Sequence, residues 1–311
     1  MKCSGCLIGC LQFFRLSVTS LWEWLIDHDV VPGKMMCRKC QQPAKFLFYD
    51  FSFRCWRPRI VRKGSRMVKV QCTFHQSARK GSWLGNSLSS VIDIAHFCSL
   101  WLCTSYPKTV KLKRITGFTS LTVGNWTSAC RETCISWASN PARRVGGQGT
   151  VVEVAEAKFG EKRYSLGRKK DVCWVIGGIQ RGSSKIFLVH VDKQGKETLR
   201  RVLSENVLPG TSVINNCSNV YGTPSEQDSE QSDENHGLQF VLSNNSDADT
   251  RNAQRMLRRL RKFVPKGRKR EQFQGYLAEY VFRQAYRPKE RLHHFFVEAS
   301  KVGSSRGSMI A

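Results

Sequence analysis

Hydrophobic and polar residues alternate most regularly between residues 150 and 215. Three segments there show the period of two that is typical of β-strands, and RGSS between the last two predicts a hairpin. A segment with helical spacing follows and stops at Pro209-Gly210, and one more strand comes after it. The predicted strands are 150–159, 172–180, 185–192 and 211–215, with the helix at 195–208.

Helical spacing of apolar residues predicts most of the remaining elements. The first 34 residues read as one helix and a connector ending at Pro32-Gly33, and 86–106 read as a helix capped by Asn86 or Ser87 and ended by Pro107. A short helix, a tight turn at Gly117 and a second helix capped by Thr119 or Ser120 form a helix-turn-helix pattern. The other predicted helices are 109–116, 121–137, the first half of 251–270 up to Pro265, and 272–286.

These patterns divide the chain into segments of different composition. Residues 222–249 hold seven acidic residues and few apolar ones, which predicts a disordered surface loop. The predicted segments are an N-terminal helical segment (1–34), a basic cysteine-rich module (35–80), a helical region with the helix-turn-helix (86–138), a linker (139–149), an α/β domain (150–300) and a disordered tail (301–311).

The charge balance indicates a polyanionic partner. The chain has 50 Lys and Arg against 24 Asp and Glu, a net charge of +26, and Lys and Arg gain affinity by releasing counterions from phosphates. Residues 54–80 carry nine cations and no acid, and 251–270 carry ten cations and no acid. We therefore expect double-stranded DNA as the partner, against the alternative of a merely basic soluble protein. The predicted contacts are Arg57, Arg59, Arg62, Lys63, Lys113, Arg114, Thr122, Asn125, Arg131, Arg258, Arg259 and Arg261.

Thirteen cysteines do not predict a disulfide scaffold here. The number is odd, no signal peptide opens the chain, and no apolar run reaches the ~20 residues of a membrane span. We expect reduced thiols, no membrane and an intracellular, nuclear location, since PKGRKR at 265–270 is typical of nuclear import signals or of a solvated helix face.

One cysteine group has the spacing of a metal site. Cys37 and Cys40 form a C-x-x-C knuckle, and Cys55 and Cys72 complete a set of four that would hold one structural zinc ion. His75 is an alternative fourth ligand, and four ordinary reduced cysteines are the competing interpretation. A second group, Cys3, Cys6 and Cys10, lies on an apolar segment and is predicted to pack.

Several longer motifs extend this picture: VVEVAEAKFGEKRYSLGR, WVIGGIQRGSSKIFLVHV, ETLRRVLSENVLPGTSVINN with a later Tyr221, NHGLQFV, YLAEYVFR and, further upstream, RKGSWL. In order and spacing the chain resembles the Merlin superfamily of DNA transposases and their bacterial insertion-sequence relatives. The resemblance implies a zinc ribbon and a helix-turn-helix followed by an RNase H-like nuclease domain with a mixed sheet, and assembly as a dimer or larger.

The same resemblance implies three acidic residues that hold two catalytic Mg²⁺ or Mn²⁺ ions. The family's acid positions are occupied here by Ala155, Asn216 and Gln254, so no catalytic metal is expected. Neighbouring acids could replace the missing metal ligands only if they met at one site. Glu153 shares a strand face with Ala155 and would have to lie close to Asp247 or Asp249, whereas Glu156 points to the other face.

The function we expect is therefore a transposase-derived DNA-binding protein without strand-transfer activity. The alternatives are an active or residual metal-dependent nuclease or transposase, and a degenerate transposon copy with no selected role.

Overall fold

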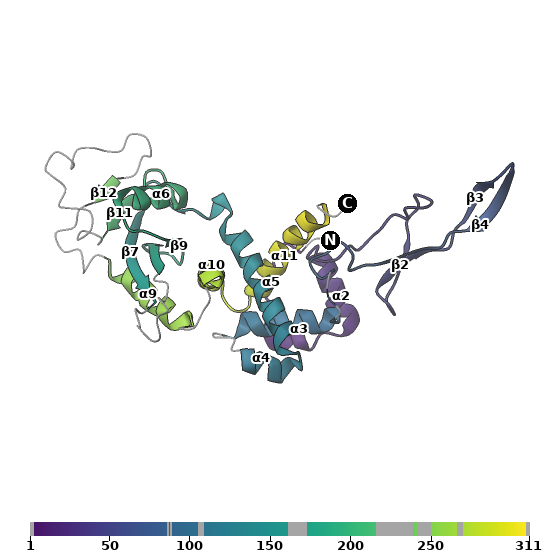
Figure 1. Ribbon diagram of the computed structural model, residues 1–311, viewed down its shortest axis with the longest axis horizontal. Helices are drawn as coiled ribbons and strands as arrows, with labels where there is room; N and C mark the ends of the chain where they lie inside the picture. The colour runs from purple at the N-terminus through teal and green to yellow at the C-terminus, as the bar shows by residue number, and fades with distance from the viewer. Residues whose placement is uncertain are drawn as a thin grey trace, which may run out of the picture. The chain divides into compact units, whose positions relative to one another are not determined.

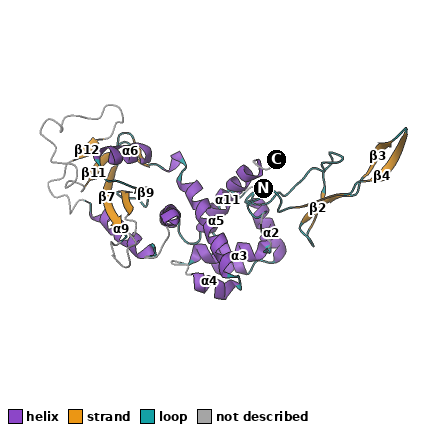
Figure 2. Cartoon of the chain, in the orientation of Figure 1, coloured by secondary structure: helices purple, strands orange, loops and turns teal. Residues whose placement is uncertain are grey.

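The computed structural model describes residues 3–85, 87, 89–104, 109–160, 173–215, 239–241, 250–265 and 270–308, and it contains both helices and small sheets (Figures 1 and 2). The chain forms two compact units, one of residues 1–133 with 288–311 and the other of residues 134–287. The division falls within a long helix, before the predicted linker at 139–149. Except for 239–241, the predicted acidic loop lies outside the described residues.

The first unit contains helices at both ends of the sequence and a strand-rich insertion. Its elements are α1 (Cys10–Phe14), α2 (Val18–Asp27), β1 (Lys45–Leu47), β2 (Ser52–Cys55), β3 (Pro58–Lys63), β4 (Arg66–Gln71), β5 (Phe74–Ser77), α3 (Val91–Cys103), α4 (Thr109–Thr116), most of α5 (Ser120–Ala138) and α11 (Arg291–Ser308).

Two helix starts differ from the prediction. The single helix expected in 1–34 is two helices, because the Ser17 hydroxyl accepts a hydrogen bond from Ser20 N (3.1 Å) and starts α2. The helix expected from residue 86 begins at Val91, because the residue whose side chain caps it is Ser90, which accepts from Asp93 N (3.1 Å). Pro107, its expected stop, lies outside the described residues.

Aromatic side chains form the core between α1, α2, α3 and α11. Phe13 packs edge-on against Trp24 (ring centroids 5.1 Å apart) and lies parallel to Phe296 of α11 (6.2 Å). The tail predicted from residue 301 is helical as far as Ser308. One reason is Gly303, where an added Cβ would lie 2.4 Å from Trp83 N, so only glycine lets α11 pack this closely.

The second unit is built around one five-stranded sheet. Its elements are the last residues of α5, the 3₁₀ turn η1 (Pro141–Arg143), β6 (Val145–Gly146), β7 (Val151–Phe159), β8 (Cys173–Gln180), β9 (Ile186–Val191), α6 (Lys196–Asn206), β10 (Val207–Leu208), β11 (Ser212–Asn215), β12 (Gln239–Val241), α9 (Arg251–Phe263), the 3₁₀ turn η2 (Arg270–Gln272) and α10 (Phe273–Ala285).

Strand order in this sheet is β12-β11-β7-β8-β9. The strands β7, β8 and β9 are antiparallel, and β11 and β12 run parallel to β7. The four strands and the helix predicted between 150 and 215 are confirmed. The strands β7 and β8 are buried almost continuously rather than on alternate residues, as is typical of a sheet that is covered on both faces.

Helices cover the two faces of the sheet, as Figure 1 shows for α6 and α9 around β7. On one face, Ala155, Ala157 and Phe159 pack under the apolar sides of α9 and α10. On the other face, Val152 and Val154 pack with α6. The predicted linker is ordered, because β6 pairs with β10 and buries Val145 completely. No helix among the described residues is both long and apolar enough to cross a membrane.

Candidate metal centre and nucleic-acid surface

The cysteine module brings Cys37, Cys40, Cys55 and Cys72 together. The first two lie in a tight turn in which Cys37 N donates to Gln42 O (2.8 Å), and Cys55 ends β2. Cys72 lies between β4 and β5. The turn, the end of β2 and the link between β4 and β5 therefore supply the four side chains from three separate places in the sequence.

The four Sγ atoms lie within 4.8 Å of one another. Cys37 Sγ is 3.4 Å from Cys72 Sγ, and Cys40 Sγ is 3.5 Å from Cys55 Sγ. A tetrahedral ion with metal–sulfur bonds of ~2.3 Å separates its sulfurs by ~3.8 Å, so a small outward movement would admit a metal ion. The predicted alternative ligand, His75, is exposed on β5 and lies outside the group.

Backbone amides lower the pKa of two thiols in this cluster, whereas the neighbouring thiols lower the pKa of one and raise that of the other. Burial raises the pKa of Cys37, but hydrogen bonds from the N–H groups of Lys39 and Cys40 and from nearby thiols hold it at about 7. A backbone hydrogen bond from Gln42 lowers the pKa of Cys40, whereas burial and the thiols of Cys55 and Cys37 raise it to about 11. Four thiolates at neutral pH therefore need a cation among them.

A β-hairpin explains the wide gap between Cys55 and Cys72. The strands β3 and β4 pair only with each other among the described strands, and Lys63 pairs with Arg66 across a two-residue turn. Gly64 starts this turn with φ of 59°, a conformation that glycine adopts without strain. Cys72 N donates to Arg57 O (2.9 Å), so the hairpin closes next to the cysteine cluster.

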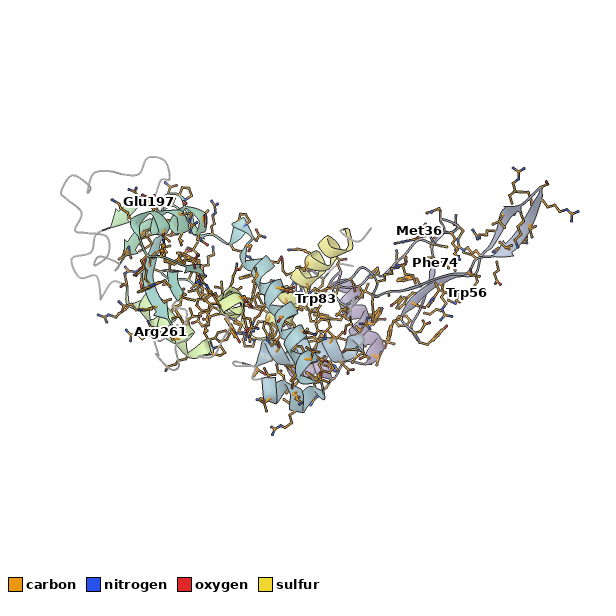
Figure 3. The ribbon with its side chains drawn as sticks, in the orientation of Figure 1. Met36, Trp56, Phe74, Trp83, Glu197 and Arg261 are labelled. Atoms are coloured by element: carbon orange, nitrogen blue, oxygen red, sulfur yellow. The ribbon has the colours of Figure 1, made fainter. Side chains whose placement is uncertain are left out.

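The hairpin is cationic and open to solvent. Ile60 and Met67 are 67% and 68% exposed, and most of the side chains are exposed, as Figure 3 shows for the nitrogen-tipped chains that project from both strands. No acidic residue occurs between Arg54 and Lys80. The cations along the hairpin and its base are Arg57, Arg59, Arg62, Lys63, Arg66 and Lys69.

The predicted helix, turn and helix lie where the sequence placed them, as α4 and α5. Gly117 adopts φ of 71° in the turn, and Thr119 Oγ1 accepts from Thr122 N (3.1 Å) at the start of α5. The exposed cations Lys113 and Arg114 lie on α4.

The three base-reading residues predicted on α5 do not share one face. At 3.6 residues per turn, Arg131 lies about 180° around the helix from Thr122. The Thr122 hydroxyl is hydrogen-bonded to Thr119 Oγ1 (2.9 Å), and the exposed stripe that contains Asn125 also contains Glu132. An acidic residue on that stripe opposes close approach to phosphates.

Two of the three positions that the resemblance to transposases would assign to metal-binding acids can be located. Ala155 is 4% exposed on β7 and belongs to the core under α9, and Gln254 is half-buried in the first turn of α9. Asn216 lies outside the described residues, as do Asp247 and Asp249. Neither located side chain offers a charged oxygen to a metal ion.

Glu153 has a structural role that the sequence did not indicate. Its carboxylate is 1% exposed and accepts from Asn252 N (2.9 Å), Asn252 Nδ2 (2.8 Å) and Ala253 N (3.3 Å) at the start of α9. Arg181 Nε donates to it from the turn that follows β8 (2.8 Å). A carboxylate at a helix N-terminus satisfies the free N–H groups and the helix dipole, so Glu153 joins α9 to β7.

The helix α9 has a basic, exposed face on the side opposite its buried apolar face. Ala253, Met256, Leu257 and Leu260 face the sheet, and the predicted contacts Arg258 and Arg259 are exposed. Arg261, labelled in Figure 3, is partly engaged, because its Nη2 donates to Lys158 O (3.3 Å) and its guanidinium lies 5.8 Å from the Phe159 ring centre.

The N-terminal cysteines differ from the packing prediction. Cys10 does pack, and its Sγ accepts from Ser99 Oγ (3.2 Å). Cys3 and Cys6 instead form a group with His28 and His293, in which one ligand atom from each residue lies within 4.8 Å of the others. This group too could hold a metal ion.

A scan against protein-family models matches no family, and a search of curated proteins finds no match.

Proposed function

We propose that this chain is a transposase-derived DNA-binding protein that holds duplex DNA without cutting it. The observation that carries the proposal is the β3–β4 hairpin, an acid-free and solvent-exposed ribbon that closes beside a four-cysteine cluster. We take the ion of that cluster to be Zn²⁺, since four thiolates in tetrahedral arrangement are its typical structural site.

The shape of the hairpin suits duplex DNA. A two-stranded β-ribbon fits the major groove, where cations along both strands can reach phosphates on either side. Arg62, Lys63 and Arg66 lie near the turn, and Arg59 lies close to the base of the hairpin. Ile60 and Met67 offer exposed apolar contacts for base edges. The cations of α4 and α9 would add phosphate contacts from elsewhere in the chain.

The absence of strand transfer rests on the positions that replace the family's acids. Three antiparallel strands followed by a helix and parallel strands support an RNase H-like core. Within it Ala155 is buried against α9, and Glu153, the nearest carboxylate, is already bound to Arg181 and to the N-terminus of α9. Two divalent ions would find no pair of free carboxylates among these described residues.

The resemblance to transposases and the run at 265–270 extend the proposal to self-association and to a nuclear location.

Fluorescence anisotropy with a labelled duplex across a range of salt concentrations tests the role of the hairpin. The variant changes Arg59, Arg62, Lys63 and Arg66 to Gln. If each cation neutralises one phosphate, the slope of log K against log[salt] decreases by about 3.6. If the affinities converge at about 1 M salt, binding at about 0.1 M salt falls on the order of 10³-fold.

The control changes four exposed cations of the second unit to Gln: Lys193, Lys196, Arg200 and Arg201. It removes the same net charge, so it reveals any loss that depends on charge alone. Equal affinities for the two variants, or no binding by the unmodified protein at low salt, would contradict the proposal.

A further inference from the structure

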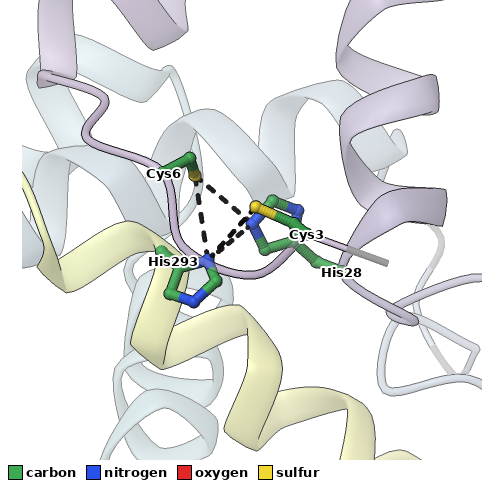
Figure 4. A group of neighbouring side chains, drawn as sticks. All are labelled: Cys3, Cys6, His28 and His293. Carbon is green, nitrogen blue, oxygen red and sulfur yellow. Dashed lines mark hydrogen bonds between the residues drawn. The ribbon is translucent and has the colours of Figure 1, made fainter. Parts of the chain in front are cut away.

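The second Cys/His group lies where three distant segments meet in the first unit. Cys3 and Cys6 belong to the extended segment before α1, His28 follows the last turn of α2, and His293 lies in the first turn of α11. Figure 4 shows the two sulfurs and one nitrogen of each ring turned toward one another.

Backbone hydrogen bonds hold the segment with the two cysteines at both of its ends. Cys3 N donates to Asp27 O (3.0 Å) at the end of α2, and Ile8 N donates to Lys289 O (3.1 Å) just before α11. Both histidines are buried, with 3% of His28 and 7% of His293 exposed. The main chain thus holds the two cysteines next to the end of α2 and the start of α11, which carry the two buried histidines.

The distances match a tetrahedral ion with two sulfur and two nitrogen ligands. Bond lengths of ~2.3 Å to sulfur and ~2.05 Å to nitrogen place nitrogens ~3.3 Å apart and sulfur ~3.6 Å from nitrogen. The observed separations are 3.0 Å for His28 Nε2 to His293 Nδ1 and 3.4 Å for Cys6 Sγ to His28 Nε2. From His293 Nδ1, Cys3 Sγ lies 3.6 Å away and Cys6 Sγ 3.8 Å away.

A hydrogen bond outside the group fixes the form of one imidazole. His28 Nδ1 lies 2.6 Å from Trp24 O, a carbonyl that can only accept, so the proton is on Nδ1 and Nε2 presents its lone pair to the group. Metal-binding histidines are typically held by such a hydrogen bond to a backbone carbonyl. Trp24 also stacks on the His28 ring, with centroids 3.6 Å apart.

We propose that Cys3, Cys6, His28 and His293 form a second, structural Zn²⁺ site that joins the start of the chain to α2 and α11. Two thiolates and two imidazoles in tetrahedral arrangement favour zinc among the divalent metals. Four protein ligands leave no open position for substrate, so the ion is structural. It closes a loop of more than 260 residues between His28 and His293 and thereby stabilises the docking of α11.

X-ray absorption at the zinc edge of the unmodified full chain tests this site without any substitution. The expected result is two zinc ions per chain with an average of three sulfur and one nitrogen neighbours, from one four-cysteine site and one mixed site. A single ion with only sulfur neighbours would overturn the second site. A single ion with two sulfurs and two nitrogens would support it and contradict the zinc site of the proposed function.

Variants assign the second ion to these residues. Cys6→Ser and His293→Asn are each expected to lower zinc content by one ion per chain and to remove the nitrogen neighbours. The matched controls Cys10→Ser and His294→Asn are expected to keep both ions. Unchanged zinc content in the first pair would overturn the assignment, and the measurement on the unmodified chain still decides the question if either variant does not fold.

Discussion

Replacing Glu153 by alanine tests whether its carboxylate has a structural role rather than a catalytic one. The change removes the hydrogen bonds to Asn252 and Ala253 at the start of α9 and the ion pair with Arg181. Loss of a helix cap costs about 1 kcal/mol, and loss of a charged hydrogen bond about 1.5–3 kcal/mol. Because Arg181 is 40% exposed, its ion pair adds little, and we expect about 3 kcal/mol in total.

Hydrogen exchange measures this change locally, which matters because two compact units need not unfold together. A loss of about 3 kcal/mol speeds exchange of the α9 amides on the order of 100-fold. Amides of α3 in the other unit serve as the internal reference. Glu156→Ala is the matched control, since Glu156 on the same strand accepts from Gln194 Nε2 (2.6 Å) and does not cap α9. Unchanged exchange in α9 after Glu153→Ala would refute the capping role.

Three further predictions concern single side chains. Arg79→Lys should destabilise the first unit by about 2 kcal/mol in urea unfolding, the size of a lost hydrogen bond to a charged group. One guanidinium donates to the carbonyls of Leu84, Ser87 and Ser89, and an ammonium cannot span all three. Burial lowers the pKa of His96 below 6.5, although the charge of Asp93 opposes this shift. The unfolded chain therefore binds the proton first, and the stability of the fold decreases as the pH drops from 6.5 toward the pKa of the folded state. His96→Phe should weaken this pH dependence in melting curves at about pH 7.5 and about pH 5.5. Ala155→Asp should lower the melting temperature without creating cleavage activity, because it places a carboxylate in the core under α9; a stable, cleaving variant would contradict this.

Local patterns predicted much of the second unit and the helix pair before it. The strands around Val151–Phe159 follow from alternation along the chain, and the turn at Gly117 follows from a residue that tolerates positive φ. The four-cysteine cluster was also predicted, since a C-x-x-C pair is a local signal. Only the structure decides between Cys72 and His75, because that choice depends on which residue of a short strand region faces the cluster.

Features that depend on long-range contacts were not predictable in this way. Glu153 caps a helix that begins 98 residues later, and no local pattern links it to Asn252. His28 and His293 meet although 265 positions separate them. The helix α11 was not predicted, although Leu292, Phe295, Phe296 and Ala299 recur at helical spacing. Its last turns contain glycine and serine, and Gly303 packs there against Trp83. The hairpin β3–β4 was not predicted, because its many cations leave few apolar residues to show the period of two that is typical of a strand.

The proposed function has two parts: the chain binds duplex DNA, and it does not cleave it. Supercoiled plasmid is incubated with the full chain and Mn²⁺ at low salt, and half of each sample is deproteinised before both halves are run on one gel. The untreated half reports binding, and the deproteinised half reports cleavage. We expect retarded plasmid in the untreated half and fully supercoiled plasmid in the deproteinised half. Nicked or linear plasmid in the deproteinised half, formed in proportion to the protein added, or plasmid that is not retarded at all, would contradict the proposed function.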